Sequence, residues 1–387
     1  MTRKELFRYF IYGYLNEKMV GRWQTGGHLN RKPFKKKAIA SYLNIGRYPS
    51  WMGNALIDIA GLLELPLSLF METFLFFKYV IGAICCSRKQ EEGQIYFIGT
   101  KEQRIKQELR NARISDSEVV VIKFLGWDYG QIFEGLKQTS ILSGIRLADI
   151  CRAYRYSMRL SIFMQRKYGN NDMFFRSYSS FEFFLAAFYL SRLDLSKKVV
   201  YVETYSRWAF LCGSLNHHVI FVQHGIIGKE LNFLIKIGSP NDAYFINKKE
   251  EQYCCEYMFK KKPAVYYLEG LKFTSNEKLL LNGKKNVLIV CHYIYFDIEK
   301  RLALALNDLN AFNIYMKPHP LDPRENYEEL GDQIGAVILE KPDYPKVDEV
   351  IAYNSTLAVE YAEAGIPVIR HDEIPFEDII CKLKQIE

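Results

Sequence analysis

Short apolar runs alternate with amphipathic stretches through most of this chain, and this alternation predicts its strands and helices. In the first half, apolar runs predict buried strands at residues 94–98, 118–124, 198–203 and 219–223. A charged stretch ending near residue 112 and an amphipathic stretch over residues 207–215 predict helices. Strands that alternate with helices in this way indicate a parallel, doubly wound sheet.

The same alternation begins again after residue 270. Strands are predicted at residues 286–291 and 313–317 and near residues 337 and 350, with helices at residues 297–309, at 326–334 and from 356. The last helix is expected to end at Gly365, because glycine favours the left-handed conformation that closes many helices. We therefore predict an α/β chain with two Rossmann-like domains.

The length of 387 residues suffices for two domains, each with its own core. We expect a basic and apolar helical segment over residues 1–90, a first Rossmann-like domain over 91–270, and a second over 271–387.

The composition is typical of a folded soluble protein, with 49% hydrophobic and 25% charged residues. None of the 8 Cys has C-x-x-C spacing, so a zinc ribbon or a thioredoxin-like redox pair is disfavoured and reduced thiols in a cytosolic protein are expected. No metal-binding pattern and no glycine-rich phosphate loop occurs in the sequence. We therefore expect no metal ion and no cofactor. The lack of a glycine-rich phosphate loop counts against dehydrogenases and P-loop kinases.

The positive charge of the chain is concentrated near its start. Residues 1–50 hold eleven Lys or Arg against two Glu, a net charge of +9, while the whole chain nets +8. Residues 51–86 are apolar but are interrupted by Asp58, Glu64, Glu72 and Lys78, so no uncharged run reaches the ~20 residues of a spanning helix. This combination favours in-plane attachment to an anionic membrane surface, on the cytoplasmic face of the cell membrane.

Two alternatives to membrane attachment remain for this segment. Its helices could pack on the body of the protein with a solvated basic face. A basic arm also suits nucleic acid, but no signature of nucleic-acid binding follows it in the sequence. We therefore expect no nucleic-acid partner.

Candidate chemistry in the first half centres on Gln223-His224-Gly225, which follows a predicted strand. His224 would lie at the carboxyl end of that strand, where open α/β sheets bind ligands, as a general base or a hydrogen-bond donor to phosphate. Glu203 ends another predicted strand and is a second candidate base. Asp128 and Glu134 are further acidic candidates that the sequence does not rank.

Candidate chemistry in the second half follows two predicted strands. Lys317 and His319 lie in Lys-Pro-His-Pro, whose prolines restrict the loop. Ser355 and Thr356 begin a helix, where backbone N–H groups and the helix dipole favour an anion such as a phosphate. These groups suit a leaving nucleotide phosphate, and Glu360 on the same helix is a candidate ribose or base contact.

The chain resembles bacterial surface-polysaccharide glycosyltransferases of the GT-B architecture. Three motifs carry this resemblance: His319-Pro320, Ser355-Thr356 and Gln223-His224-Gly225. The similarity is to polysialyltransferase-like, Kdo-transferase-like and CDP-glycerol glycerophosphotransferase-like enzymes of capsule biosynthesis. It implies that the His-Pro and Ser/Thr motifs bind the donor nucleotide, with residues 91–270 as the acceptor domain and residues 271–387 as the nucleotide-donor domain. The acidic pair that supplies the base in sialyltransferase-like members has no clear match, since Phe133-Glu134-Gly135 is half of one.

The resemblance implies a metal-independent transferase that moves a sugar or polyol phosphate from a CMP-, CDP- or UDP-linked donor to a lipid-linked glycan. Two other functions remain open on the sequence. One is an isomerase like the non-hydrolysing UDP-N-acetylglucosamine 2-epimerases. The other is a non-catalytic subunit of a polysaccharide assembly complex that has kept the fold.

Overall fold

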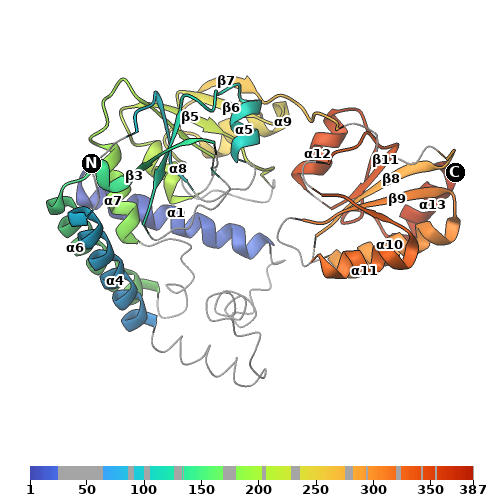
Figure 1. Cartoon of the computed structure of the whole chain (residues 1–387), viewed down its shortest axis with the longest axis horizontal. Coiled ribbons are helices and arrows are strands. Elements are labelled where there is room, and N and C mark those ends of the chain that lie inside the picture. Colours follow the sequence, from blue (N-terminus) through green and yellow to red (C-terminus); the bar gives the residue numbers. More distant parts are fainter. Residues whose placement is uncertain are drawn as a thin grey trace. The chain divides into compact units, whose positions relative to one another are not determined.

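The computed structural model describes residues 1–24, 64–85, 91–99, 105–125, 133, 135–168, 180–202, 206–227, 236–274, 282–292, 295–319, 324–340, 343–353 and 355–386 (Figure 1). The chain divides into two compact units, Met1–Leu268 (unit 1) and Glu269–Glu387 (unit 2). Each unit is built around its own parallel sheet, so the predicted α/β class with two Rossmann-like domains is confirmed.

Unit 1 contains a seven-stranded parallel sheet in the order β3-β2-β1-β4-β5-β6-β7. Its strands are β1 (Ile95–Phe97), β2 (Val119–Lys123), β3 (Lys137–Ser140), β4 (Lys198–Tyr201), β5 (His218–Val222), β6 (Asp242–Phe245) and β7 (Ala264–Tyr267). Strand order reverses between β1 and β4, and ligands of such sheets bind beyond the carboxyl ends of the strands at this point.

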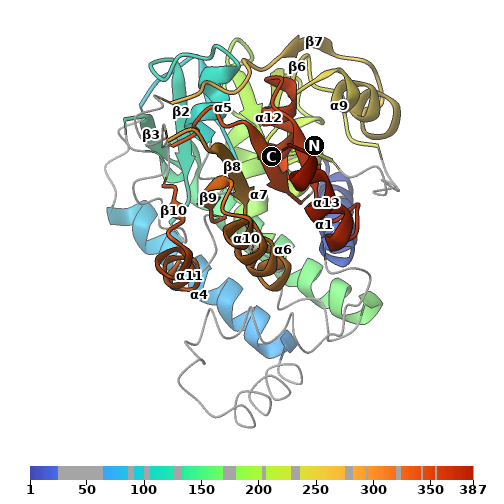
Figure 2. The ribbon, with the colours of Figure 1, turned by 90° about the vertical axis from the view of Figure 1, so that its right-hand side faces the viewer.

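Unit 1 contains one helix that is buried almost completely. The helices of this unit are α1 (Arg3–Gln24), α4 (Glu64–Cys85), α5 (Ile105–Asn111), η3 (Ile141–Gly144), α6 (Leu147–Tyr168), α7 (Ser180–Leu190), α8 (Arg207–Cys212), α9 (Lys248–Tyr253) and η4 (Cys254–Met258). Helix α7 is apolar on all sides, with ten of its eleven residues buried, as expected for a core helix. It packs against α1, α4 and α6 (Figure 2).

The amino-terminal helix α1 is part of the core of unit 1. Its Leu6, Phe10 and Tyr14 are buried in that core. Gly13 allows close contact with α8, because a Cβ at this position would lie 2.3 Å from the Cα of Arg207. The described parts of residues 1–90 therefore belong to unit 1, while the basic residues 31–47 lie outside the described residues.

Unit 2 contains a five-stranded parallel sheet in the order β10-β9-β8-β11-β12. Its strands are β8 (Lys285–Val290), β9 (Phe312–Lys317), β10 (Val337–Ile338), β11 (Glu349–Ala352) and β12 (Val368–Arg370). One face is covered by α10 (Phe296–Leu309), α11 (Glu325–Ile334) and α13 (Phe376–Ile386), and the other by α12 (Thr356–Glu363) (Figure 1). The carboxyl ends of β8 and β11 meet where the strand order reverses.

The predicted end of α12 is confirmed in detail. Gly365 has φ +80°, and the N–H groups of Gly365 and Ile366 donate to the carbonyls of Ala362 and Tyr361. This is the Schellman arrangement that a glycine at this position permits.

Candidate active site

His224 lies two residues beyond β5, at the carboxyl edge of the unit 1 sheet. The loop that carries it is held from both sides. Glu250 on α9 accepts hydrogen bonds from Gln223 Nε2 (2.7 Å) and from the Ile227 N–H (2.9 Å). Gln223 in turn accepts from the Ile246 N–H (3.1 Å). The backbone around His224 is therefore fixed before any ligand binds.

The imidazole of His224 is itself paired with a carboxylate. Its Nδ1 lies within hydrogen-bond distance of Glu108 Oε1, and the two side chains are 31% and 6% exposed. A carboxylate accepts at Nδ1, so Nδ1 carries the proton and Nε2 is the basic nitrogen. This arrangement can accept a proton from a hydroxyl and stabilise the resulting imidazolium with the adjacent negative charge.

Glu108 strengthens this interpretation because its second oxygen, Oε2, is buried without a hydrogen-bond partner among the described residues. An ionised carboxylate that lacks part of its hydrogen bonding gains more from a neighbouring positive charge. The pair is therefore suited to the protonated state of His224, which is the state that a general base reaches during reaction.

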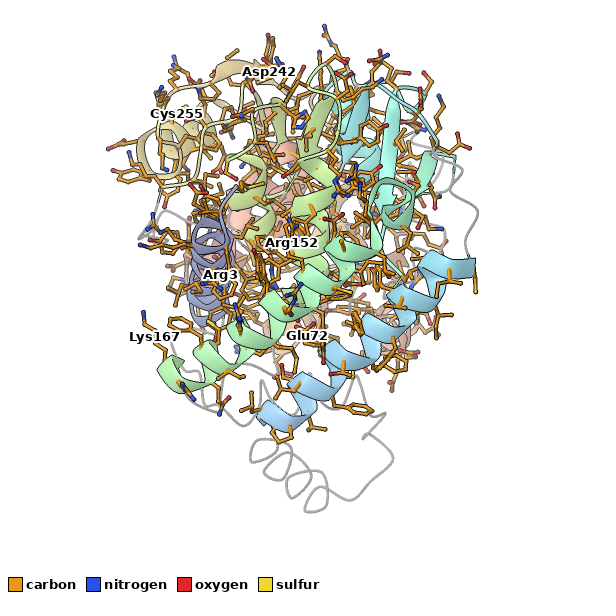
Figure 3. All side chains as sticks on the ribbon, turned by 90° about the vertical axis from the view of Figure 1, so that its left-hand side faces the viewer. Arg3, Glu72, Arg152, Lys167, Asp242 and Cys255 are labelled. Atoms are coloured by element: carbon orange, nitrogen blue, oxygen red, sulfur yellow. The ribbon has the colours of Figure 1, made fainter. Side chains whose placement is uncertain are left out.

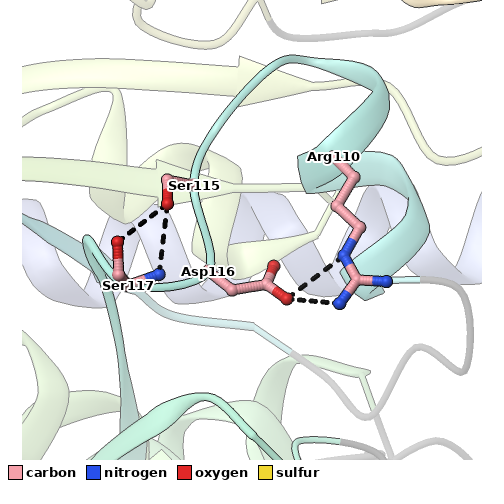
Figure 4. A network of polar contacts seen from close by, with 4 residues as sticks. All are labelled: Arg110, Ser115, Asp116 and Ser117. Carbon is pink, nitrogen blue, oxygen red and sulfur yellow. Dashed lines mark hydrogen bonds and ion pairs between the residues drawn. The ribbon is translucent and has the colours of Figure 1, made fainter.

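Glu108 lies on α5, and a defined turn follows the end of this helix. Arg113 adopts the left-handed conformation with φ 57°. Figure 4 shows Arg110 donating from Nε to Asp116 Oδ2 (3.1 Å), beside Ser115 and Ser117, whose hydroxyl oxygens lie 2.8 Å apart. These exposed contacts add little stability, but they connect the end of α5 to the start of β2.

The other acidic candidates from the sequence cannot be placed in the same way. Glu203, Asp128 and Glu134 lie outside the described residues. Glu108 was not predicted as a site residue, although its position in the sequence indicates a buried carboxylate. It is buried on α5 beside Leu109, where an unpaired carboxylate is costly and therefore needs a partner.

In unit 2, rings from successive strand ends gather at the carboxyl edge of the sheet. We call these five residues the ring cluster: His292, Tyr295, His319, Tyr353 and His371. The centroid of His292 lies 5.0 Å from that of His319 and 5.2 Å from that of Tyr353. Of this group, the sequence predicts a role only for His319. Imidazole and phenol groups together offer hydrogen-bond donors and flat apolar faces to a ligand.

A buried carboxylate supports this cluster from below. Glu299 on α10 accepts from the His292 N–H (2.9 Å) and from the Tyr327 hydroxyl (3.4 Å). Its Oε1 also lies 3.7 Å from Nε2 of His371, and the two side chains are 0% and 1% exposed. Glu299 thus holds the backbone at the end of β8 and presents a negative charge to a buried imidazole.

Lys317 ends β9 as predicted, and its ammonium group is bonded to backbone carbonyls of a neighbouring segment. Nζ donates to the carbonyls of Glu340 and Asp343, both at 2.8 Å, and lies 4.6 Å from the centroid of the Tyr344 ring. The side chain is buried. In this structure Lys317 holds the segment that follows β10 against the end of β9.

Ser355 and Thr356 lie where the sequence placed them, at the start of α12. The Ser355 hydroxyl caps the helix by accepting from the Ala358 N–H (3.1 Å). Thr356 is the first helical residue and is half-buried, as is Glu360 one turn later. Because Tyr353 lies two residues before the cap Ser355, the ring cluster and the positive end of the α12 dipole lie close together.

Within the described residues no group of three or more His, Cys, Asp or Glu side chains is arranged to hold a metal ion. The described parts of the two edges offer imidazoles and a helix start to an anion.

No protein-family model matches this chain, and no curated protein does either. Solved structures with similar folds include UDP-GlcNAc 2-epimerase from Neisseria meningitidis bound to UDP-GlcNAc, at 11% identity and TM-score 0.41 over 76% of this chain and 90% of that one. Another is Acinetobacter baumannii MurG, at 10% identity and TM-score 0.40 over 76% and 90%. A third is the wall teichoic acid polymerase TagF, at 11% and 0.35 over 79% and 78%. Similarities of this size do not assign a family or an activity.

Proposed function

We propose that this chain is a glycosyltransferase that moves a sugar, or a polyol phosphate, from a nucleotide-activated donor to a growing, lipid-linked cell-surface polysaccharide such as a capsule. The observation that carries the proposal is the imidazole of His224 at the end of β5, held by the buried carboxylate of Glu108. A binding module needs no such pair, whereas an enzyme that deprotonates a hydroxyl does.

In the proposed reaction, Nε2 of His224 takes the proton of the acceptor hydroxyl. The acceptor oxygen forms a bond to the transferred group, and the bond between that group and the nucleotide phosphate breaks. Glu108 stabilises the imidazolium that results and keeps the ring oriented. The proton is then released to solvent when the glycan departs.

The carboxyl edge of unit 2 would bind the donor. His319 and the start of α12 at Ser355 and Thr356 would contact the phosphates, and their hydrogen bonds strengthen as negative charge grows on the leaving group. The rings of Tyr295 and Tyr353 offer faces on which a nucleobase can stack, and Glu360 remains the candidate for a ribose contact. Lys317 would act indirectly, by fixing the end of β9 through its bonds to Glu340 and Asp343.

Fixed imidazoles and a helix start supply positive charge to the leaving phosphate, so we propose that transfer needs no metal ion. Activity that persists in excess EDTA supports this part of the proposal. Activity that disappears in EDTA and returns with Mg²⁺ or Mn²⁺ contradicts it.

The first experiment is a thermal-shift screen of the purified chain with CMP, CDP, UDP and GDP. A ligand that binds only the folded state raises the apparent stability, by about 2.7 kcal/mol at a hundred times its Kd. The shift should occur with one nucleotide and be lost in His319→Ala. Selective stabilisation by CMP would indicate a sialic-acid-like or Kdo-like donor, by CDP a polyol-phosphate donor, and by UDP or GDP a hexose donor.

Turnover assays of the purified chain, with and without a glycan acceptor, then distinguish the remaining functions. A transferase consumes the activated donor only when a glycan acceptor is added. An epimerase interconverts its nucleotide sugar without any acceptor, and this outcome would replace the proposal. A non-catalytic subunit would bind nucleotide or glycan and yet turn over neither, with His224→Ala leaving glycan production in cells unchanged.

A further inference from the structure

Helix α4 has two faces with opposite properties. One face is attached to unit 1 by specific polar bonds. Glu72 accepts from the N–H and the hydroxyl of Ser180 (3.0 and 2.7 Å) and so caps the start of α7. The Tyr79 hydroxyl donates to Glu182 (2.7 Å), and the ring of Phe76 stacks on Tyr154.

The opposite face of α4 carries large apolar side chains that are more than half exposed. We call it the apolar stripe: Phe70 (65% exposed), Phe74 (55%), Phe77 (57%), Ile81 (60%) and Ile84 (74%). Their spacing of four and three residues keeps them on one side of the helix along its length. Exposed apolar rows of this length on a folded domain indicate a contact surface.

Helix α6 lies beside α4 and adds positive charge to the same side of unit 1, as Figure 3 shows with Arg152 and Lys167 labelled. Its outward positions alternate between basic residues and two apolar ones, Ile162 and Phe163 (38% and 41% exposed). We call its exposed cations the basic row: Arg152, Arg155, Arg159, Arg166 and Lys167.

We infer that the apolar stripe and the basic row together dock unit 1 on an anionic lipid bilayer, with α4 lying in the plane of the interface. The stripe enters the region between headgroups and acyl chains, while the basic row contacts acidic headgroups. A protein partner would not require a continuous apolar row with cations alongside it, whereas an anionic bilayer offers both complements over the whole length of the two helices. The inference does not depend on the proposed reaction.

Helix α4 could cross a membrane by length and composition, since Leu65–Cys85 has a mean hydropathy of 1.6 over its most apolar window and only 11% of that window is buried. Its attachment argues for the in-plane arrangement. A spanning helix would carry the buried Glu72 carboxylate and its bonds to Ser180 into the hydrocarbon, together with the packed helices α6 and α7.

The test is co-sedimentation of the full-length chain with vesicles of phosphatidylglycerol and phosphatidylcholine, compared with phosphatidylcholine alone. Phe74→Ser with Ile81→Ser removes part of the stripe. Arg155→Glu with Arg159→Glu reverses part of the basic row. Matched controls are Leu195→Ser, an exposed apolar residue elsewhere (66% exposed), and Lys260→Glu with Lys261→Glu, exposed cations that follow η4.

We expect the wild-type chain to bind the anionic vesicles and to bind phosphatidylcholine weakly. One cation near an anionic surface contributes about fivefold in partitioning, so reversing two should reduce binding by about 25-fold or more. Loss of the two apolar side chains should reduce it by about tenfold or more. The controls should bind as wild type, and all variants should keep the wild-type melting temperature.

Three results would overturn the inference. The first is unchanged binding in both test variants. The second is resistance of the vesicle-bound chain to extraction at alkaline pH, which indicates a spanning helix. The third is a chain that does not bind vesicles but dimerises with concentration, with Phe74→Ser and Ile81→Ser restoring the monomer, because the stripe then pairs with a second copy.

Discussion

The two units place an imidazole and a buried glutamate at the carboxyl edge of their sheets, but they connect the two groups differently. In unit 1, Glu108 bonds directly to the ring of His224. In unit 2, Glu299 bonds to the backbone N–H of His292, and the His292 ring faces those of His319 and Tyr353. A carboxylate on the ring controls where its proton resides, whereas a carboxylate on the backbone controls only where the ring lies.

This difference separates two kinds of chemistry. The unit 1 pair is suited to proton transfer, because the charge of Glu108 compensates the charge that His224 gains. The ring cluster of unit 2 is suited to binding, because several hydrogen-bonding groups and flat ring faces converge there. Substitutions in the two units should therefore affect different steps, the chemical step in unit 1 and donor binding in unit 2.

The strongest test makes the same substitution, histidine to alanine, once in each unit. His224→Ala should lower kcat by about 10²–10⁴-fold, the usual contribution of a general base, and leave donor Kd unchanged. His319→Ala should instead weaken donor binding by about tenfold or more, through loss of a hydrogen bond to a charged phosphate. Kinetics of transfer and calorimetric titration with the donor nucleotide measure the two effects. Equal losses of kcat and affinity in both variants would show that the two edges do not divide the work.

Glu108→Gln tests whether the buried carboxylate positions and supports His224. The amide oxygen can still accept from Nδ1, but it carries no charge to stabilise the imidazolium. We expect kcat to fall by about 10–100-fold with KM unchanged, because the acceptor and donor contacts remain. A fall in melting temperature that accounts for the lost activity, or a rise in KM alone, would make Glu108 a structural residue.

The sequence was informative about the fold because the central strands of both sheets are short apolar runs. Those near residues 119, 199, 219, 286 and 313 were each predicted to within about two residues of their observed ends. The edge strand β10 was predicted near residue 337, but both edge strands of unit 1 were missed. β3 and β7 are mostly exposed or half-buried, so their composition does not carry the apolar signal that the prediction depends on.

Helices α6 and α7 were missed for opposite reasons, although both are long. Helix α7 is apolar on all sides and has no period to detect. Helix α6 is amphipathic, with exposed cations opposite its buried residues, so its helical period was present in the sequence and was not recognised.

The candidate site divides in the same way. His224, His319 and Ser355 follow strands, and strand ends can be read from the sequence. The residues that support them come from elsewhere in the chain: Glu108 is 116 positions from His224. His371 joins Tyr295 and Tyr353 only because β12 lies next to β11 in the sheet. Pairings of this kind depend on sheet order, which periodicity does not determine.

Two buried tyrosines provide a matched pair with a smaller expected effect. Tyr201 in unit 1 and Tyr361 in unit 2 are both 0% exposed, and burial raises the pKa of both phenols. The Tyr361 hydroxyl donates to the carbonyl of Pro345 (3.0 Å), while the Tyr201 hydroxyl has no partner among the described residues. Replacing each tyrosine with phenylalanine should therefore change the free energy of unfolding differently in the two units.

We expect Tyr361→Phe to lower the free energy of unfolding by about 1–3 kcal/mol, since it leaves a buried carbonyl without its donor. Tyr201→Phe should leave it unchanged or raise it by about 1 kcal/mol, because it removes a buried hydroxyl that has no bond to lose. Denaturant unfolding of the two variants measures the difference. Equal destabilisation by both would mean that the Tyr201 hydroxyl is bonded in solution.

The smallest expected effect concerns the pH dependence of the loop that carries His224. Burial raises the pKa of Glu250, against the lowering effect of its bonds from Ile227 and Gln223, and burial also raises the pKa of Glu349 in unit 2. A raised folded-state pKa means that the protonated form is favoured on folding. The stabilisation is therefore complete below the unfolded pKa and is lost as the pH rises through the folded pKa.

Glu250→Gln and Glu349→Gln should each gain stability relative to wild type as the pH rises from 4.5 towards 7, because neither amide titrates. Only Glu250 also holds Gln223 and Ile227, so only Glu250→Gln should make the pH dependence of transfer less steep. Thermal unfolding and kcat measured across this pH range separate the two readouts. If both variants alter kcat equally, the loop around His224 is not the group that responds to pH.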